Sequence, residues 1–188
     1  MSGTPLAHLV ALAKLAEQSA AALEAPVKTY VTWIQETLAR GGTLYFAGNG
    51  GSAAHAQHIA TEYVVRYQKN RRPARAVALT TDTSLITAAA NDLGFELVFA
   101  RQVEALARQG DLVVLISTSG NSPNLVLAAE AARDAKVRTV GLLGGSGGQL
   151  KAAVDLAIIV PSSDTAHIQE IQLAVDHHVC GLVESGLA

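Results

Sequence analysis

Five short apolar segments alternate with helix-like segments along most of this chain, and this alternation limits the possible folds more than any other feature. Apolar residues recur every three or four positions near residues 52–68, 83–91, 96–108, 122–135 and 164–186. The apolar segments are continuous, which is typical of strands buried on both faces of a parallel sheet. We therefore predict an α/β fold with a doubly wound, five-stranded parallel sheet of the flavodoxin-like type. The predicted strands are Thr43–Ala47, Ala76–Leu79, Leu112–Ile116, Thr139–Leu143 and Leu156–Val160.

Apolar residues with helical spacing also fill the first forty residues, ahead of the first strand. The pattern breaks at Pro26 and resumes at Val27, and the pair Gly41-Gly42 ends it. We therefore predict helices on both sides of Pro26, within residues 1–41. The length of 188 residues fits one domain, residues 1–188, which includes these N-terminal helices.

The composition argues against several classes of protein. Hydrophobic residues make up 49% of the chain, so disorder is not expected, and aromatic residues only 4%, so the core must consist of Ala, Val, Leu and Ile. Basic and acidic residues, 14 against 16, give a net charge of -2, which argues against a nucleic-acid binder. The sequence contains no run of 18 apolar residues, so no membrane span is predicted, and its start lacks the basic residues of a secretory signal. The single cysteine, Cys180, fits a reducing compartment, so we predict a cytoplasmic protein.

Two of the predicted strands run directly into loops suited to a phosphate. In the first, Gly48-Asn49-Gly50-Gly51-Ser52, glycines let the backbone approach a ligand, and the next helix offers free N–H groups. It matches neither the P-loop nor the GxGxxG pattern, so a simple tight turn is an equal alternative. The second, Ser117-Thr118-Ser119-Gly120-Asn121-Ser122, has four hydroxyl residues in six positions ahead of Pro123. A capping turn with Ser122 as N-cap uses only one hydroxyl, so we favour an anion-binding loop.

A third group of residues can bind a metal. His58 and Glu62 lie four apart on a predicted helix, which puts both side chains on one face. Gln169 and His177 lie eight apart on the last predicted helix, separated by about 80° around its axis. Two imidazoles, a carboxylate and an amide oxygen form a set that suits zinc. A His–Glu pair on a helix is more often a surface pair, and that alternative stays open.

The remaining polar residues are assigned more modest roles. His8, His55, His167 and His178 have no evident partner in the sequence, so we predict that they lie on the surface or behind the ligands. Cys180 is predicted to fill a small apolar space in its helix. Five basic residues fall within Arg66–Arg75, which either a solvated loop or a phosphate site explains.

Taken together, these motifs resemble those of the phosphoheptose isomerases, a group within the sugar isomerase (SIS) domain superfamily. The resemblance rests on the loop Gly48–Ser52 with His58 and Glu62, on the serine-rich loop, and on Ile168-Gln169-Glu170 with His177. It implies a flavodoxin-like SIS fold and a homotetramer with active sites at subunit interfaces, for which residues 1–41 would supply helices. It also implies one Zn²⁺ per subunit and a phosphosugar substrate, with no nucleic-acid or membrane partner.

The resemblance further implies a role for each residue of the motifs. The zinc ligands would be His58, Glu62, Gln169 and His177. The substrate contacts would be Asn49, Gly50, Gly51, Ser52, Glu62, Asn91, Asp92 and Gln169 for the sugar, and Ser117, Thr118, Ser119 and Ser122 for its phosphate. The implied reaction interconverts D-sedoheptulose 7-phosphate and D-glycero-D-manno-heptose 7-phosphate, the first step of heptose biosynthesis.

The exchange of ketose and aldose moves a proton between C1 and C2 through an enediol, so it needs a base and an acid. We assign Glu62 as the base and His177 as the acid, with zinc polarising the carbonyl. A carboxylate held by zinc is a poor base, so it stays open whether Glu62 fills both roles at once.

The sequence departs from the family pattern at three positions. His55 stands where an Asp is common, His167 where an Arg or Lys is usual, and Gln172 where a His is frequent. None of these departures removes a predicted ligand. Arg66, four residues after Glu62, matches a family arginine that would hold substrate or an adjacent subunit.

Two other functions are compatible with parts of the pattern. Adaptor proteins of the same superfamily, which bind the replication initiator DnaA, share the first loop and its helix but lack the histidine that His177 supplies here. Other phosphosugar isomerases or sugar-phosphate sensors of this fold generally work without a metal. The histidine and the zinc set therefore favour the zinc-dependent isomerase.

Overall fold

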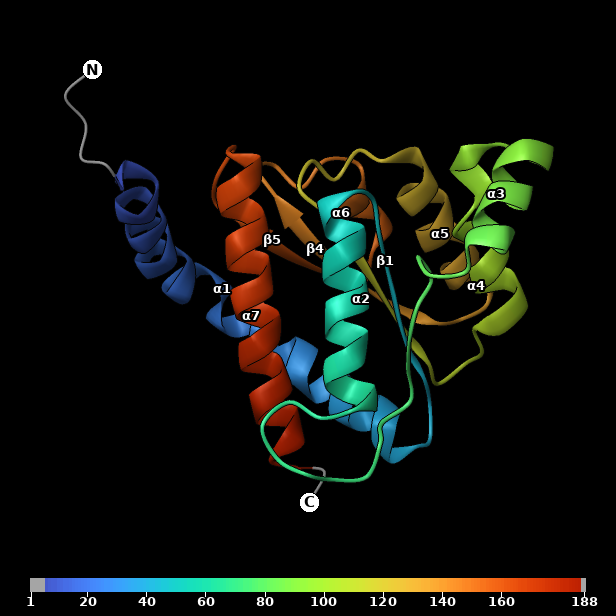
Figure 1. Ribbon diagram of the computed structural model, residues 1–188, viewed down its shortest axis with the longest axis horizontal. Coiled ribbons are helices and arrows are strands. Elements are labelled where there is room, and N and C mark those ends of the chain that lie inside the picture. The colour runs from blue at the N-terminus through green and yellow to red at the C-terminus, as the bar shows by residue number, and fades with distance from the viewer. Residues whose placement is uncertain (1–5, 187–188) are drawn as a thin grey trace.

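The structure is a computed structural model that describes residues 6–186, and its centre is a five-stranded, wholly parallel sheet (Figure 1). The strand order is β2-β1-β3-β4-β5. Each strand lies within one residue of its predicted bounds, so the predicted doubly wound α/β fold is confirmed. The strands are β1 (Leu44–Gly48), β2 (Ala76–Ala78), β3 (Leu112–Ser117), β4 (Arg138–Gly144) and β5 (Leu156–Val160).

Helices cover both faces of the sheet. On one face, Leu112, Val114 and Ile116 of β3 belong to a core shared with α1, α2 and α7, and on the other Val113 and Leu115 belong to a core shared with α4, α5 and α6. Successive side chains of a strand point to opposite faces, so a continuous apolar run fills both cores. The helices are α1 (Ala7–Ala39), α2 (Gly51–Val64), α3 (Thr83–Asp92), α4 (Ala100–Leu106), α5 (Pro123–Asp134), α6 (Leu150–Ala153) and α7 (Thr165–Glu184), with a 3₁₀ turn η1 at Phe95–Leu97. Within residues 6–186, no helix is both long and apolar enough to cross a membrane.

The strand order places β1 and β3 side by side, although β2 lies between them in the sequence. Gly48, the last residue of β1, pairs with Ile116 near the end of β3. The loops that follow these two strands therefore leave the sheet at neighbouring points. Parallel α/β sheets bind ligands at such a point, where the connections diverge to opposite sides.

Helix α1 is a single helix of 33 residues, so the predicted break at Pro26 is wrong. Pro26 lacks the N–H that would bond to the carbonyl of Ala22, and a proline in a helix interior costs about 3 kcal/mol. The buried face of α1 nevertheless continues past it, with Leu23, Val27 and Tyr30 all packed in the core. Burial of each such side chain contributes about 1.5–3 kcal/mol, so the packing on both sides outweighs the local cost.

Three other helix boundaries differ from the predicted ones. Helix α2 ends at Val64 instead of reaching residue 68, because the N–H groups of residues 67–69 bond to a side chain of α7. The expected helix 96–108 is divided into η1 and a shorter α4, after Gly94 turns the chain at φ +104°. Helix α6 was not predicted, since four residues are too few to show a period.

The basic segment Arg66–Arg75 is partly fastened to the protein by Glu184, at the end of α7. The carboxylate accepts N–H bonds from Tyr67, Gln68 and Lys69 at 2.8–3.1 Å, and its Oε1 lies 3.3 Å from Nε of Arg71. The two charged side chains are 5% and 3% exposed. Burial of Glu184 opposes its charged form, but the three N–H groups and the guanidinium outweigh it and lower the pKa.

Arg71 also explains how this segment closes the end of α2. Its guanidinium donates to the carbonyl oxygens of Glu62 and Tyr63, which lie in the last turn of α2 and have no partner further along the helix. One arginine therefore joins the ends of α2 and α7. For Arg71, neither of the two predicted explanations, a solvated loop or a phosphate site, is correct.

We expect Glu184→Gln to lower the free energy of unfolding by about 3 kcal/mol at pH 7, because it leaves the buried Arg71 without its counter-charge. The folded protein lowers the pKa of Glu184 below its ordinary value of 4.5, so this contribution is present above that pH and is lost as the pH falls further. Urea unfolding at pH 7 and at pH 3 should show that the difference in free energy of unfolding between wild type and Glu184→Gln is smaller at pH 3. The exposed Glu130→Gln on α5 serves as the control, and equal stability of wild type and Glu184→Gln at pH 7 would contradict this role.

Candidate active site

Two loops meet at the carboxyl end of the sheet, one joining β1 to α2 and the other joining β3 to α5. The side-chain amides of Asn49 and Asn124 hydrogen-bond each other in both directions, with each Nδ2 2.9 Å from the partner's Oδ1. Each amide still has one N–H and one lone pair to offer a ligand. The structure therefore brings the two predicted phosphate loops together and links them directly.

The first loop also meets the last helix of the chain. A side chain at Gly51 would place its Cβ 2.8 Å from Nε2 of Gln169, so the glycine leaves the space that this amide occupies. Gly50 adopts φ +55°, a conformation that few other residues accept, and Ser52 is buried in the first turn of α2. The predicted substrate contacts of this loop and Gln169 thus lie next to one another.

The serine-rich loop presents hydroxyl groups around the start of α5. Ser117 Oγ accepts the N–H of Gly120 at 3.0 Å and lies 3.5 Å from Oγ of Ser122. Ser122 occupies the N-cap position, but its side chain makes no capping hydrogen bond. The simple capping turn therefore does not account for this hydroxyl, and the first N–H groups of α5 are not engaged by it. Thr118 is half-buried and Ser119 exposed.

Gly120 holds the serine-rich loop close to the loop that follows β4. It adopts φ +67°, and a Cβ there would lie 1.9 Å from the carbonyl oxygen of Gly147. Leu150 donates its N–H to the Gly120 carbonyl at 2.9 Å. The shape of the hydroxyl cradle therefore depends on a glycine at this position.

Three of the four predicted metal ligands converge between α2 and α7, which lie side by side (Figure 1). These are His58, Glu62 and His177, and we call them the histidine group. His58 Nε2 lies 2.9 Å from His177 Nε2 and 3.5 Å from Glu62 Oε1. The ring of Tyr67 stacks on His177, with centroids 5.6 Å apart. The His58 side chain is 46% exposed and that of Glu62 18%, so the group is open to solvent on one side.

The fourth predicted ligand, Gln169, lies two turns nearer the start of α7, against Gly51. Along the helix axis this is about 12 Å from His177. Gln172, between them, is 1% exposed, and neither atom of its amide has a hydrogen-bond partner. The assignment of Gln169 to the metal stays a prediction.

A buried polar contact lies behind the histidine group and was missed by the sequence analysis. His55 Nε2 approaches Asp176 Oδ2 at 2.9 Å, with side chains 6% and 1% exposed, and Tyr30 donates to the other carboxylate oxygen at 3.2 Å. His55 is therefore a core residue of α2 with a partner on α7, one position before His177. No spacing rule connects residues this far apart in the chain.

Burial affects the neighbouring titratable groups. It raises the pKa of the Tyr30 hydroxyl, and the charge of Asp176 adds to this effect. It also raises the pKa of the Cys180 thiol to about 12, again with Asp176 contributing. Cys180 therefore stays a protonated, buried thiol, as its predicted role as an apolar filler requires.

The remaining predicted residues lie apart from these groups. Asn91 and Asp92 are exposed at the end of α3, and Asn91 Nδ2 donates to Asp92 Oδ1 at 2.7 Å. No hydrogen bond or ion pair within residues 6–186 joins this pair to the two loops or to the histidine group. Arg66 is likewise exposed beyond the end of α2.

Comparison with known proteins agrees with this fold. The model of the SIS domain family matches residues 8–144. A phosphoheptose isomerase of Trichlorobacter lovleyi is 52% identical over 173 residues, which cover 92% of this chain and 88% of the relative.

Solved structures extend the comparison to the fold. Phosphoheptose isomerase GmhA from Neisseria gonorrhoeae superposes with a TM-score of 0.91 at 38% identity, covering 95% of this chain and 96% of that one. A phosphoheptose isomerase from Francisella tularensis gives 0.92 at 33% identity, covering 95% of both. The chain therefore belongs to the SIS domain family and, within it, to the phosphoheptose isomerases.

Proposed function

We propose that this protein interconverts D-sedoheptulose 7-phosphate and D-glycero-D-manno-heptose 7-phosphate, as the first step of heptose biosynthesis. The observation that carries the proposal is the position of an acid–base group, His58 with Glu62 and His177, on the two helices that also border the phosphate-type loops. Its relatives, which are named phosphoheptose isomerases, support the same reaction.

The loops supply what the phosphate end of this substrate needs. The hydroxyls of Ser117 and Ser122, together with Thr118 and Ser119, donate hydrogen bonds, and the start of α5 adds N–H groups and the positive end of its dipole. From Gly51 to His58 the helix rises about 10 Å. That length is comparable to an extended seven-carbon chain with a terminal phosphate, so C1 and C2 reach the histidine group while the phosphate stays at the loops.

The proton transfer is assigned to two residues of that group. Glu62 removes the proton from one carbon of the C1–C2 pair and returns it to the other, and His177 exchanges a proton with the sugar oxygens. The stacked ring of Tyr67 fixes the orientation of the His177 imidazole. Asn49 and Gln169, which lie at the glycine loop, would hold sugar hydroxyls.

The donors fit a zinc ion. Two imidazole nitrogens 2.9 Å apart face each other, with a carboxylate oxygen 3.5 Å from one of them. Neighbouring ligands of tetrahedral zinc are about 3.3 Å apart, and imidazole with carboxylate is a common zinc set. His58, Glu62 and His177 would hold the ion, with Gln169 as the fourth predicted ligand and one Zn²⁺ per subunit. Zinc, when bound, supplies a Lewis acid that polarises the sugar carbonyl.

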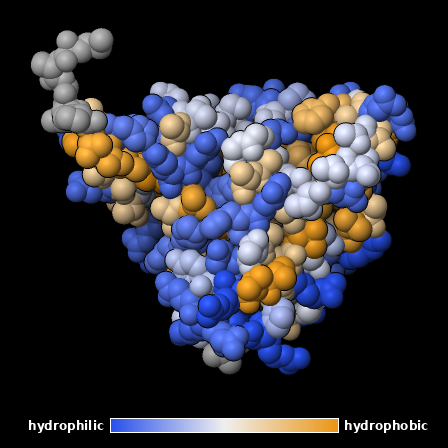
Figure 2. Space-filling view, in the orientation of Figure 1, coloured by the Kyte–Doolittle hydropathy of each residue, from blue (hydrophilic) through white to orange (hydrophobic). Residues whose placement is uncertain are grey.

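A homotetramer is the second part of the proposal. Helices α1 and α7 border a groove of about 590 Å³ that is lined mainly by apolar side chains, among them Leu23, Val27 and Val175. Further apolar side chains are exposed at the start of α1, including Leu9 and Val10. The space-filling view likewise shows apolar surface over the start of this helix (Figure 2). We propose that helices of other copies of this chain cover the groove.

This assembly gives Asn91 and Asp92 a place in the reaction. Within residues 6–186 no hydrogen bond or ion pair joins this pair to the two loops, so we assign it to the substrate of a neighbouring subunit. The active sites would then lie at subunit interfaces. The buried free thiol of Cys180 fits a reducing compartment, which supports a cytoplasmic location.

The reaction is tested by incubating the protein with sedoheptulose 7-phosphate and following aldose formation, with and without a chelator. We expect activity that the chelator removes and added Zn²⁺ restores, and loss of the bound zinc in His58→Ala. Gln57→Ala, its exposed neighbour on α2, should keep zinc and activity. Full isomerase activity in the metal-free protein would reject the zinc assignment, and no activity with zinc bound would reject the substrate.

Glu62→Gln should reduce kcat by about 10²–10⁴-fold, because it replaces the base with an amide of the same shape. Circular dichroism should show an unchanged fold, since the Glu62 side chain is not part of the core. Glu17→Gln, on the exposed side of α1, is the matched control with normal turnover. Nearly normal turnover in Glu62→Gln would eliminate this residue as the base.

A charge placed in the α1–α7 groove should separate the subunits. Ala174→Glu changes an exposed position in the groove of one chain, so a folded but dissociated protein is expected. Ala152→Glu, exposed on α6, should leave the assembly intact. Sedimentation velocity measures the oligomeric state of both variants and of wild type. A monomeric wild type would reject the proposed tetramer.

A further inference from the structure

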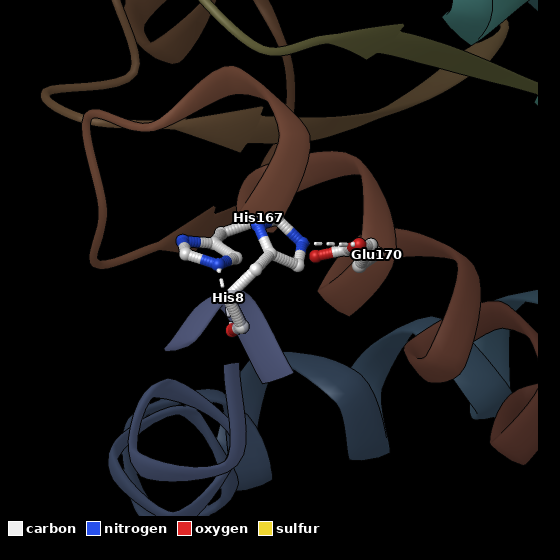
Figure 3. A group of neighbouring side chains, drawn as sticks. All are labelled: His8, His167 and Glu170. Atoms are coloured by element: carbon white, nitrogen blue, oxygen red, sulfur yellow. Dashed lines mark hydrogen bonds and ion pairs between the residues drawn. The ribbon is translucent and has the colours of Figure 1, made fainter. Parts of the chain in front are cut away.

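A second group of side chains whose donor atoms could hold a metal lies outside the candidate active site, where the first turn of α1 meets the beginning of α7 (Figure 3). It consists of His8, His167 and Glu170, and one donor atom from each lies within 4.8 Å of the other two. His8 Nε2 is 2.7 Å from Glu170 Oε1, and the two imidazole rings have centroids 4.2 Å apart.

This group is separate from the histidine group of the active site. Glu170 precedes His177 by seven residues, or about 10 Å along the axis of α7. Its partner comes from α1, whereas His177 meets His58 on α2. The two groups share no residue.

The carboxylate of Glu170 is the first sign that a cation belongs here. Its Oε1 is engaged by His8, but its Oε2 is buried and has no hydrogen-bond partner in the described part of the chain. A buried carboxylate oxygen without a donor is costly, and a bound cation removes that cost. His8 alone does not, since it contacts only the other oxygen.

The orientation of His167 is the second sign. Its Nδ1 faces Asp164 Oδ2 at 3.8 Å, while its Nε2 lies on the side of His8 and donates a hydrogen bond to the carbonyl oxygen of that residue at 3.3 Å, and a bound metal would take the place of that proton. Histidines that bind metals commonly direct the other ring nitrogen to a carboxylate, which fixes the ring. Asp164 is the N-cap of α7, so its position is itself held by the helix start.

We propose that His8, His167 and Glu170 bind a divalent metal ion of the zinc class, distinct from the zinc of the active site. Two imidazoles and one carboxylate suit Zn²⁺, Co²⁺ or Ni²⁺ and disfavour Mg²⁺ and Ca²⁺, which prefer oxygen. Ligands of tetrahedral zinc are about 3.3 Å apart, within the present range of separations. The side chains of His8 and Glu170 are 47% and 38% exposed, so they can rotate to meet the ion, and water completes the coordination.

The bound ion would fasten the first turns of α1 to α7. The first buried residue of α1 is Leu15, and Leu12 is the single half-buried residue among positions 7–14. Leu6, at the N-cap position of the helix, also makes no side-chain capping hydrogen bond. The two hydrogen bonds of His8, to Glu170 and from His167, are therefore the main polar attachment of this end, and a metal would replace them with coordinate bonds.

The test is an isothermal calorimetric titration of the metal-stripped, full-length protein with Zn²⁺. Wild type should bind two ions per chain, His8→Ala and His167→Ala one, and His58→Ala one. The double variant His8→Ala/His58→Ala should bind none. His178→Ala removes an exposed imidazole of α7 that belongs to neither group, and it should still bind two.

The outcomes separate this site from the active-site zinc. If wild type binds one ion and His58→Ala binds none, the second site is wrong while the active-site assignment stands. If wild type binds a single ion that His58→Ala retains and His8→Ala loses, the second site stands and the active-site assignment fails. Equal binding by wild type, His8→Ala and His167→Ala would overturn the proposal.

Hydrogen exchange gives a readout that a merely structural His8 contact would not change. Adding Zn²⁺ to wild type should slow amide exchange in residues 7–14, and adding it to His8→Ala or Glu170→Gln should not. A Zn²⁺-independent exchange rate for this segment in wild type would contradict the fastening of α1.

Discussion

Helices α2 and α7 lie side by side on one face of the sheet, and the candidate active site exists because of this contact. Each helix carries part of the histidine group, and each borders the glycine loop at one end. The buried approach of His55 to Asp176 joins the helices within one turn of His58 and His177, and Arg71 with Glu184 joins their far ends. Breaking a buried pair of this kind is costly, so the helices keep their spacing even though the histidine group between them is open to water.

The net charge of -2 is compatible with an anionic substrate because of how the loops are built. Hydroxyls and helix N-termini recognise a phosphate through oriented dipoles rather than a field of positive charge. Arg71, a basic residue that follows the helix of His58 and Glu62, is used elsewhere, since it holds the ends of α2 and α7 together. The reciprocal amide pair of Asn49 and Asn124 then fixes the distance between the two loops without any charge.

The features that could be predicted are those with a local signature. The strands show as apolar runs, His58 and Glu62 as an i, i+4 pair, and the serine loop as hydroxyls ahead of Pro123. The missed features depend on residues far apart in the chain. The partner of His55 could not be seen in the sequence because Asp176 lies on another helix. The same holds for His8, whose partner Glu170 also lies on another helix. The break expected at Pro26 failed for the same reason, since the core contacts that keep α1 continuous come from other elements.

The order of these elements along the chain has a consequence for folding kinetics. Helix α2 follows the first strand, whereas α7 follows the last, so their contacts span more than a hundred residues. Such long-range contacts form late and slow the folding of a domain. During synthesis α2 would wait without its contacts to α7, such as that of His55 with Asp176, a state that favours association with other chains. Until α7 docks, the nascent chain therefore holds all five strands of the sheet but only His58 and Glu62 of its histidine group.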